Sequence, residues 1–471
     1  MKRNIYHFSF FIALLVLINA CSVHKKYEQP QLDVPATYRG VSYSDTSTIA
    51  DIEWRRFYTD TDLQKLIETG LDNNHDLLVA IKRMEMSTKR VQQSKLLNLP
   101  DLNLQITGQY NRPSNNSLNG ISVKNFLGKS HVENYMAVGN LSWEVDVWGK
   151  IKGQKELALA RYLQSQEGIK AVQTSLVAQI AQGYYNLLML DKQLEIARSN
   201  LALNDSFLVA TRLLKDAGIS NALAVQQAEV QKRSTELLIP QLEEAIELQE
   251  NSIQVLTGQM PGPVKRNSKL DELNLFTGIE AGTPVAIVSR RPDVRTAELD
   301  LIAANAEAGI AKANLYPALN LTLGGGLESF RASNWFNLPN SLFGLVAGTI
   351  AQPVFQRGRL KTEADLALLQ REEAVIRFRQ SVLQATTEVT DALLQLRKLK
   401  EQEAIAAAQT DTLHKAIETA QLLFRSDMAT YLEIITVQGN ALQAELELAA
   451  IRRNQLTSKV ELYRALGGGW K

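Results

Sequence analysis

Residues that could hold a metal, form a disulfide or act as a nucleophile are scarce in this sequence. Its 471 residues include a single cysteine, Cys21, and five histidines without metal-ligand spacing. One cysteine cannot form a disulfide within the chain, and scattered histidines argue against a zinc or di-metal enzyme. A Gly-x-Ser-x-Gly nucleophile elbow and a Cys/His nucleophile set are absent as well. We therefore expect no enzymatic activity, no bound metal and no cofactor.

A strong net charge is also missing. The formal net charge is +1 and charged residues make up 21% of the chain, so no basic field would attract nucleic acid. Aromatic residues are only 7% of the total, whereas Ala, Leu, Gln and Glu are concentrated in the second half. That composition is typical of long helices. From the absence of a basic field, we expect no nucleic-acid partner.

Long apolar runs are missing except near the start of the chain. Lys2 and Arg3 precede an almost unbroken apolar run, Phe8 to Ile18, which is typical of an export signal over residues 1–20. This run is shorter than the roughly 20 residues that a spanning helix needs. It ends in Leu-Ile-Asn-Ala-Cys21, which resembles a bacterial lipobox and implies cleavage before Cys21 and acylation of that residue; a buried free cysteine is the alternative. Any membrane crossing would therefore have to be made by β-strands.

The second half of the sequence repeats the first. Asp76 and Pro100 match residues 217 positions later, and after a change of eight residues the offset stays at 209. The matched pairs are Asp76/Asp293, Pro100/Pro317, Gly149/Gly358, Leu223/Leu432 and Gly258/Gly467. Chance similarity between Ala/Leu-rich helices is the alternative, but it would not keep one register with aligned glycines. We interpret the chain as an internal duplication with one longer loop in the first copy.

Each copy has the same predicted order: a medium helix (about 75–98 and 293–314), two strand-like stretches, and a long helical hairpin. The strand-like stretches alternate apolar and polar residues over about ten positions, the length of a tilted membrane strand. The apolar positions are Leu102, Leu104, Ile106, Gly108 and Tyr110, then Tyr135, Ala137, Leu141, Trp143 and Val145, then Leu319, Leu321, Leu323 and Leu327. The fourth stretch, 342–351, is apolar at both parities. Tyr110, Tyr135 and Trp143 are candidates for the lipid–water boundaries.

Four strands leave an open sheet. Even the smallest outer-membrane barrels have about eight strands, and unsatisfied edges in lipid would cost several kcal/mol per group. If the strands span a membrane, the chain must therefore share them with identical chains. Two soluble hairpins packed on the helices are the alternative.

The helical stretches are unusually long. Lys150 to Lys215 contains no proline and would extend roughly 100 Å, and Gly358 to Arg425 is similar. Two adjacent apolar seams in the first stretch predict a helix with neighbours on both sides. The seams are Val172, Leu176, Ile180, Leu187, Leu190 and Leu194, and Val177, Ala181, Tyr184 and Leu188. A third face with Gln179, Gln182, Asn186 and Gln193 is either a lumen lining or a solvated surface.

Several short motifs, in order over more than 400 residues, resemble one known family. They are Trp54, Phe57, Asp62-Leu63 and Leu66-Ile67; Asn74-His75-Asp76-Leu77; Trp143 to Lys150; Ser289 to Val294; Pro353-Val354-Phe355 before Gly358; and Leu462 to Trp470. The chain is similar to the TolC-like outer-membrane efflux proteins, specifically the lipidated OprM/NodT-like branch that serves resistance–nodulation–division (RND) pumps.

The resemblance implies a mainly α fold with β: long helical hairpins forming a trimeric periplasmic α-barrel, plus a shared 12-stranded transmembrane β-barrel with four strands per chain. It implies a homotrimer that is lipid-anchored in the bacterial outer membrane, with most of its mass in the periplasm. It also implies a periplasmic adaptor and an inner-membrane RND transporter as partners. The expected function is a passive exit duct for drugs or other small toxic compounds; the duct of a type I protein secretion system is the alternative.

The resemblance further implies domain boundaries. The expected segments are a signal peptide at 1–20, an anchor and equatorial segment at 21–62, a first repeat at 63–258, an equatorial linker at 259–290, a second repeat at 291–467 and a tail at 468–471. Within the repeats we expect β-hairpins at about 101–147 and 318–353, and long helical hairpins at about 149–257 and 357–466.

A periplasmic gate is expected at the second helix turn. Leu432 matches the family's constricting leucine, where three copies would form an apolar ring that resists wetting; an ordinary coiled-coil leucine is the alternative. Thr436 stands where an aspartate is frequent, Asp427 replaces a usual glycine and Phe424 a usual tyrosine. The resemblance therefore does not carry over an acidic ring at the aperture, nor a tyrosine hydroxyl that could hold the closed state. Arg425 completes the candidate set.

The two helix-tip turns are expected to dock the adaptor. Gly218 marks the first turn, as a helix C-cap glycine, and Asp427 marks the second. Glu433 is a possible substitute for the missing aspartate.

Overall fold

The computed structural model describes residues 26–32, 35, 37–39, 48–273, 284–426 and 428–470. Cys21 and Asp427, two of the expected site residues, lie outside the described residues. The chain divides into two compact units. The strand unit contains Glu85–Leu163 and Glu298–Ile376, and the helical unit contains Gln31–Met84, Gln164–Ala297 and Arg377–Lys471. Each unit therefore takes parts of both sequence copies.

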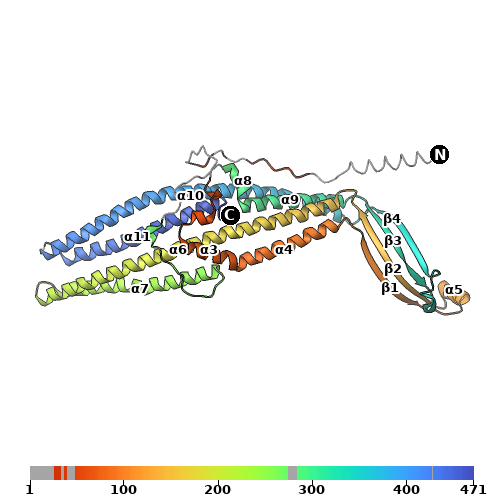
Figure 1. The fold of residues 1–471 in the computed structure, drawn as a ribbon, viewed down its shortest axis with the longest axis horizontal. Helices are drawn as coiled ribbons and strands as arrows, with labels where there is room; N and C mark the ends of the chain where they lie inside the picture. The colour runs from red at the N-terminus through yellow and green to blue at the C-terminus, as the bar shows by residue number, and fades with distance from the viewer. Residues whose placement is uncertain are drawn as a thin grey trace. The chain divides into compact units, whose positions relative to one another are not determined.

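Four antiparallel strands form one sheet in the strand unit, in the order β1-β2-β3-β4 (Figure 1). They are β1 (Asp101–Asn111), β2 (Val132–Val145), β3 (Ala318–Ser329) and β4 (Leu342–Ala351). Because β2 pairs with β3, the two hairpins are joined into a single sheet. The loop after β1 contains α5 (Leu118–Leu127), and the loop after β3 contains η4 (Ala332–Asn334).

The helices repeat in matched pairs. Helices α4 (His75–Leu96) and α9 (Pro292–Ala313) both have 22 residues. Helices α6 (Lys150–Asp216) and α10 (Arg359–Arg425) both have 67, and α7 (Ala222–Leu256) and α11 (Tyr431–Ala465) both have 35. The offsets of 217 and 209 residues seen in the sequence recur at both ends of every pair. The predicted mainly helical, duplicated fold is confirmed.

Short elements complete the helical unit. They are η1 (Ile49–Asp51), α2 (Trp54–Phe57), α3 (Thr61–Asn73), η2 (Leu270–Glu272), η3 (Pro284–Ala286) and α8 (Ile287–Arg290). Asn74 joins two parts of this unit, because its Oδ1 accepts from the amide of Leu77 at 3.0 Å and caps α4. Its Nδ2 donates to the carbonyl of Leu256, in the last turn of α7, at 2.9 Å.

The core of the helical unit is aromatic. Phe57 stacks on Tyr463 with ring centroids 4.1 Å apart, and the Tyr463 hydroxyl donates to the carbonyl of Ile52 at 2.6 Å. The hydroxyl of buried Tyr184 donates to the Asp60 carboxylate at 2.8 Å, and the other oxygen of Asp60 caps α3. Burial raises the pKa of the Tyr184 hydroxyl far above its ordinary value, with Asp60 adding to the shift. These contacts fasten the N-terminal segment to α6 and to the end of α11.

Both apolar seams of α6 are buried over most of their length, as their spacing predicted. Leu176 in the first seam is 4% exposed, and Ala181 in the second is fully buried. On the third face of α6, amide side chains bond to neighbouring helices, a role that neither alternative included. Gln182 donates to Glu461 of α11 at 2.5 Å, and Asn186 donates to Gln249 of α7 at 2.8 Å.

Across the described ranges, none of the helices combines the length and the apolar character that a transmembrane helix requires.

Helix α5 was not predicted from the sequence. It has only ten residues, and its boundaries come from caps rather than from a buried apolar face. The Ser117 hydroxyl accepts from the amide of Gly120 at 3.1 Å, and Gly128 ends the helix in the left-handed region with φ 64°. A search for helical periodicity therefore could not find it.

Candidate functional site

One face of the sheet is aliphatic and uncovered. Directly paired residues on antiparallel strands lie on the same face, so the register defines the rows of side chains. One such row is Leu102, Leu141, Leu323 and Val346, and the next is Leu104, Gly139, Gly325 and Gly344. Leu104 is 77% exposed and Val346 81% exposed. The hairpins are therefore not packed on the helices through this face, and that alternative is wrong.

The opposite face is polar on the first strands and changes at β4. Asn103 pairs with Asn140, and Gln105 and Thr107 lie on the same side of β1. At β4 the register resolves the ambiguous stretch: Leu342, Val346 and Ile350 join the aliphatic face, and Phe343 and Leu345 lie on the other. Sequence parity alone could not decide this, because both parities of β4 are apolar.

Aromatic side chains lie at both ends of the sheet. At the end next to the helices, Trp143 donates to the carbonyl of Asn98 at 3.0 Å, and Trp148 stacks on Tyr316 with centroids 4.8 Å apart. At the opposite end, where the loops after β1 and β3 lie, Tyr110 stacks on His131 at 4.8 Å, and Tyr135 packs against Trp335 at 5.7 Å. Such paired girdles are typical of strands that end at two membrane–water interfaces.

Both edges of the sheet are open. Within the described residues, β1 and β4 stand at the two ends of the strand order, so each pairs on one side only. An edge strand presents a row of unpaired N–H and C=O groups that can pair with another chain.

The two helix tips are built alike. At the first, Gly218 has φ 77° and the amide of Ile219 donates to the carbonyl of Leu214 at 2.9 Å. At the second, 209 residues later, the amide of Met428 donates to the carbonyl of Leu423 at the same distance. Both bonds satisfy a carbonyl left open at the end of a helix, as in a Schellman turn.

Leu432 is 55% exposed, and its counterpart Leu223 in the first copy is 53% exposed. In this chain Leu432 is therefore not a core residue of the α10–α11 pair. The Thr436 hydroxyl donates to the carbonyl of Leu432 at 2.7 Å, so this hydroxyl is hydrogen-bonded within α11. The Glu433 carboxylate accepts from the amide of Thr430 at 2.5 Å and caps α11, which gives this residue a structural role.

Phe424 and Arg425 differ in environment. The ring of Phe424 packs against Phe207 of α6 with centroids 5.9 Å apart, which joins the tips of the two hairpins. Arg425, the last residue of α10, is exposed. Of the expected gate residues, the structure thus gathers Leu432, Thr436, Phe424 and Arg425 at one turn.

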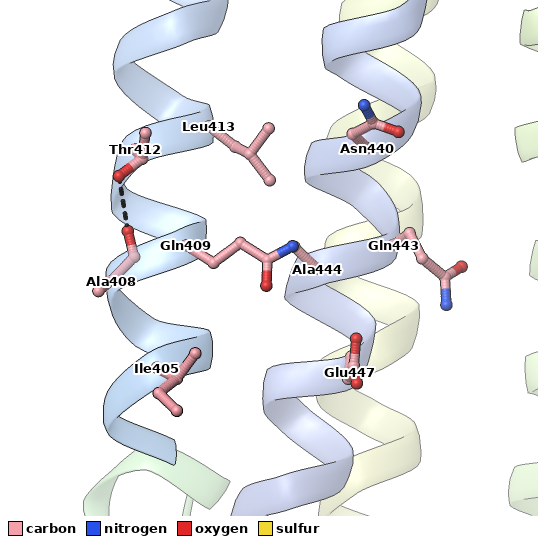
Figure 2. Close-up of a pocket in the computed structure, with 9 residues that line it drawn as sticks. All are labelled: Ile405, Ala408, Gln409, Thr412, Leu413, Asn440, Gln443, Ala444 and Glu447. Atoms are coloured by element: carbon pink, nitrogen blue, oxygen red, sulfur yellow. Dashed lines mark hydrogen bonds between the residues drawn. The ribbon is translucent and has the colours of Figure 1, made fainter. Parts of the chain in front are cut away.

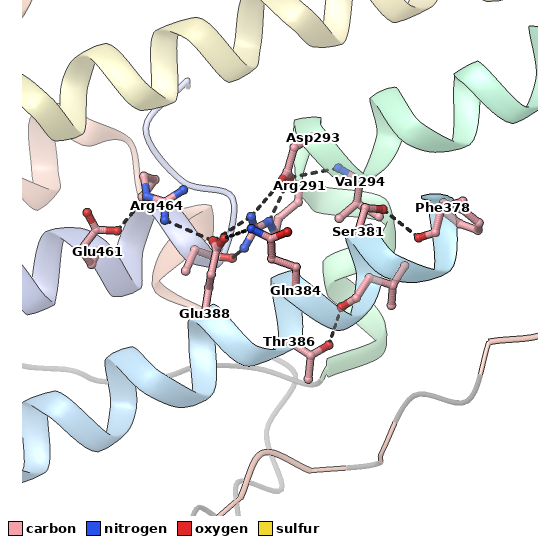
Figure 3. A network of polar contacts seen from close by, with 12 residues as sticks. Arg291, Asp293, Val294, Phe378, Ser381, Gln384, Thr386, Glu388, Glu461 and Arg464 are labelled. Carbon is pink, nitrogen blue, oxygen red and sulfur yellow. Dashed lines mark hydrogen bonds and ion pairs between the residues drawn. The ribbon is translucent and has the colours of Figure 1, made fainter. Parts of the chain in front are cut away.

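A polar network centred on the buried Arg291 lies where α8, α9, α10 and α11 meet (Figure 3). Arg291 is 3% exposed and donates to both oxygens of Asp293, at 2.9 and 2.6 Å, and to Glu388 at 2.9 Å. It also donates to the carbonyl of Ala465, the last residue of α11, at 3.0 Å. Burial raises the pKa of the Asp293 carboxyl, but the hydrogen bonds and charge of Arg291 outweigh it and lower that pKa below its ordinary value.

The network continues towards α6. Arg464 donates to Glu388 at 3.1 Å and to Glu461 at 2.8 Å, and Glu461 accepts from Gln182. The sequence singled out Ser289–Val294 only as a family landmark. Its partners lie 97 and 174 residues away, and no local pattern indicates such distant contacts.

A groove of about 700 Å³ lies between α10 and α11, and no sequence pattern indicated it. Figure 2 shows Gln409 extending from α10 towards α11 across this groove. Its lining is mostly small, apolar or amide: Ile405, Ala408, Gln409, Thr412, Leu413, Asn440, Gln443, Ala444 and Glu447.

Apolar rows remain uncovered on the two outer helices of the helical unit. Hydrogen bonds connect α7 to α6 (Thr235 with Asn204), α6 to α11 (Gln182 with Glu461), and α11 to α10 (Gln455 with Glu403). The helices therefore follow one another in the order α7, α6, α11, α10, and α7 and α10 are the outer two (Figure 1). The exposed residues are Leu223, Val230, Leu237, Leu248 and Val255 on α7, and Leu383, Leu394 and Ile405 on α10. Spacings of 7 and 11 residues keep each row on one side of its helix.

Known proteins share both the sequence pattern and this fold. The family model described as outer membrane efflux protein matches residues 66–259 and 284–468. The probable efflux pump outer membrane protein TtgC of Pseudomonas putida is 30% identical over 464 residues, which cover 96% of this chain and 94% of the relative. The cation efflux system protein CusC of Escherichia coli is 28% identical, with 96% and 97% covered. A crystal structure of CusC has a TM-score of 0.83 at 26% identity and covers 95% of this chain and 100% of that one. This chain belongs to the TolC-like outer membrane efflux protein family.

Proposed function

We propose that this protein is the outer-membrane channel of a tripartite RND-type efflux pump and passively conducts drugs or other small toxic compounds out of the periplasm. The observation that carries the proposal is a sheet with one uncovered aliphatic face, one largely polar face and two open edges. Relatives named for the efflux of antibiotics, toluene and cations support export but differ in cargo.

The aliphatic face needs an apolar cover. Leaving side chains such as Leu104, Val346 and Ile350 in water forfeits about 25 cal/mol for each Å² of apolar surface that lipid would bury. Acyl chains supply that cover along the whole face, whereas the polar face can line a wet conduit. The strands are therefore the segment that we place in the outer membrane.

The open edges need partners of their own. Lipid offers no hydrogen bonds to the outer strands β1 and β4, so each edge has to pair with another strand. Pairing β1 of one copy with β4 of the next is a head-to-tail contact, and such contacts form a ring when the rotation between neighbouring copies closes. The apolar rows on α7 and α10 fit the same arrangement, because they also lie on opposite flanks. We propose a homotrimer.

The helix tips are the proposed gate and docking region. Leu432 is exposed at the start of α11, where three copies around an axis would form an apolar constriction. The turns at Gly218 and Asp427 would dock a periplasmic adaptor, which connects the channel to an inner-membrane RND transporter. Opening would be a small untwisting of the tip helices when the adaptor binds.

The anchor and the segment boundaries are part of the same proposal. We propose acylation at Cys21 after removal of residues 1–20, an anchor and equatorial segment at 21–62, repeats at 63–258 and 291–467, a linker at 259–290 and a tail at 468–471. Contacts of the linker with two helices support its equatorial position. Arg266 donates to Asp191 of α6 at 2.5 and 2.9 Å and to Glu250 of α7 at 2.5 Å.

Purified, detergent-extracted protein provides the test. Light scattering should give the mass of three chains, and planar bilayers containing the protein should show discrete conductance steps. A monomer in detergent, or a trimer that never conducts, would contradict the proposal. A boiled, unfolded sample serves as the control for detergent leaks.

A further inference from the structure

The loops at one end of the sheet contain basic residues but no acidic ones. These loops, residues 112–131 and 330–341, are here called the loop end. Their charged residues are Arg112, Lys124, Lys129 and Arg331, without a single Asp or Glu. The two loops follow β1 and β3, which run in the same direction, so antiparallel pairing brings both loops to one end of the sheet. In a chain with a net charge of +1, this is a marked local excess of positive charge.

Nearby carboxylates do not neutralise this excess. The two closest in sequence, Glu133 and Glu328, already accept hydrogen bonds, from His131 and Tyr135 at 3.2 and 3.4 Å and from Asn134 at 3.2 Å. Over the described part of the chain, none of the four basic side chains of the loop end takes part in an ion pair with these two carboxylates. The guanidinium of Arg331 instead lies 5.4 Å from the centre of the Phe330 ring.

The same end exposes large apolar side chains on a well-formed helix. On α5, Leu118 is 81% exposed and Phe126 is 89% exposed. Caps fix this helix at both ends, and Gly120 packs so closely that an added Cβ would lie 2.0 Å from the carbonyl oxygen of Ser114. Phe336 and Leu338 of the second loop are exposed as well. Exposed apolar groups on a fixed backbone indicate a surface that is covered in the assembled protein.

We propose that the loop end docks on the phosphate-bearing headgroups of lipids in the outer leaflet of the outer membrane, with Arg112, Lys124, Lys129 and Arg331 contacting phosphates. This rests on the proposed function, which places the aliphatic face in the membrane. The loop end continues that face through Tyr110 and Tyr135, so its apolar side chains meet the interface at the headgroup level. Phosphate is the group that matches Lys and Arg in charge and in hydrogen bonding.

The test uses the detergent-solubilised full-length protein and two probes, diphosphoryl lipid A and the same lipid after removal of both phosphates. Acyl chains and sugars are then identical, and only the phosphates differ. Binding is followed by tryptophan fluorescence, and a Trp335→Phe variant shows how much of the signal comes from the loop end. Each basic residue near an anionic surface contributes about fivefold in affinity. We expect the wild type to prefer the phosphorylated probe by at least about tenfold, and less at high salt.

The decisive variant combines Arg112→Gln, Lys124→Gln, Lys129→Gln and Arg331→Gln, and it should lose the preference. A matched control removes four exposed charges from the helices of the same unit, through Lys95→Gln, Lys152→Gln, Lys361→Gln and Arg371→Gln, and should keep it. Full preference in the decisive variant, or none in the wild type, overturns the inference. Should the decisive variant not fold, a preference in the wild type that does not respond to salt overturns it equally.

Mass and conductance are measured on the same preparation. A conducting trimer without phosphate preference refutes only the docking of the loop end. A monomer that does not conduct refutes the proposed function itself.

Discussion

A lysine placed on the aliphatic face of the sheet should be far more damaging than one placed on the adjacent polar face. Leu104 and Gln105 are neighbours in β1, and their side chains point to opposite faces. Leu104 pairs with Gly139, which is midway between Tyr135 and Trp143 on β2. The substituted position is therefore at mid-height between the two aromatic ends.

The expected magnitude follows from that depth. A Lys on the lipid face at the bilayer midplane costs about 2–4 kcal/mol, whereas a lumen-facing Lys costs little. Leu104→Lys should then lower the free energy of unfolding by about 3 kcal/mol per chain, roughly two powers of ten in the folding equilibrium. If the sheet faced water instead, the change at a side chain that is 77% exposed would stay within about 0.5 kcal/mol. The two environments thus predict clearly different outcomes.

Urea unfolding from lipid bilayers, followed by tryptophan fluorescence, measures the difference. Gln105→Lys is the matched control, because it adds the same charge one residue away. The amount of trimer in the outer-membrane fraction gives an independent measure in cells. Equal unfolding midpoints for Leu104→Lys and Gln105→Lys would refute the placement of this face in lipid.

Four further outcomes are expected. Leu432→Ala should raise the single-channel current in planar bilayers, and an unchanged current would remove this leucine from the gate. Arg291→Met should cost about 3 kcal/mol in thermal or urea unfolding, because it leaves the carbonyl of Ala465 and part of Glu388 without their buried donor. The control Arg290→Met removes a more exposed pair with Asp51 and should cost under about 1 kcal/mol. Equal losses of stability would mean that the contacts of Arg291 contribute no more than an exposed ion pair. Asp293→Asn should destabilise the protein at pH 7 and progressively less below about pH 4. A carboxyl with a lowered pKa stabilises the fold above its unfolded pKa and loses this effect as the pH falls through the folded pKa. A stability difference between wild type and variant that does not change with pH would contradict the pairing with Arg291. Cys21→Ser should abolish labelling by radioactive fatty acid and leave the trimer intact, and persistent labelling would place the lipid elsewhere.

Particular residues show why some features could be predicted and others could not. The duplication was visible because aligned glycines such as Gly258 and Gly467 recur at one offset. At Gly258 a side chain is excluded physically, because an added Cβ would lie 2.5 Å from the carbonyl oxygen of Asn73. In contrast, the interhelix bonds of Gln182 and Asn186 could not be foreseen. An amide on a helix surface has the same local pattern whether it meets water or another helix.

The sequence by itself determined the medium and long helices, the alternating strands and the internal repeat, because each depends on spacing along the chain: about 3.6 residues for a helix, two for a strand and a fixed offset for a duplication. Only the tertiary structure decided which parity of β4 joins the aliphatic face, and that Glu388 and the carbonyl of Ala465 meet Arg291. Those features depend on register and on contacts between residues far apart in the chain. Packing in three dimensions selects such contacts, and no local periodicity records them.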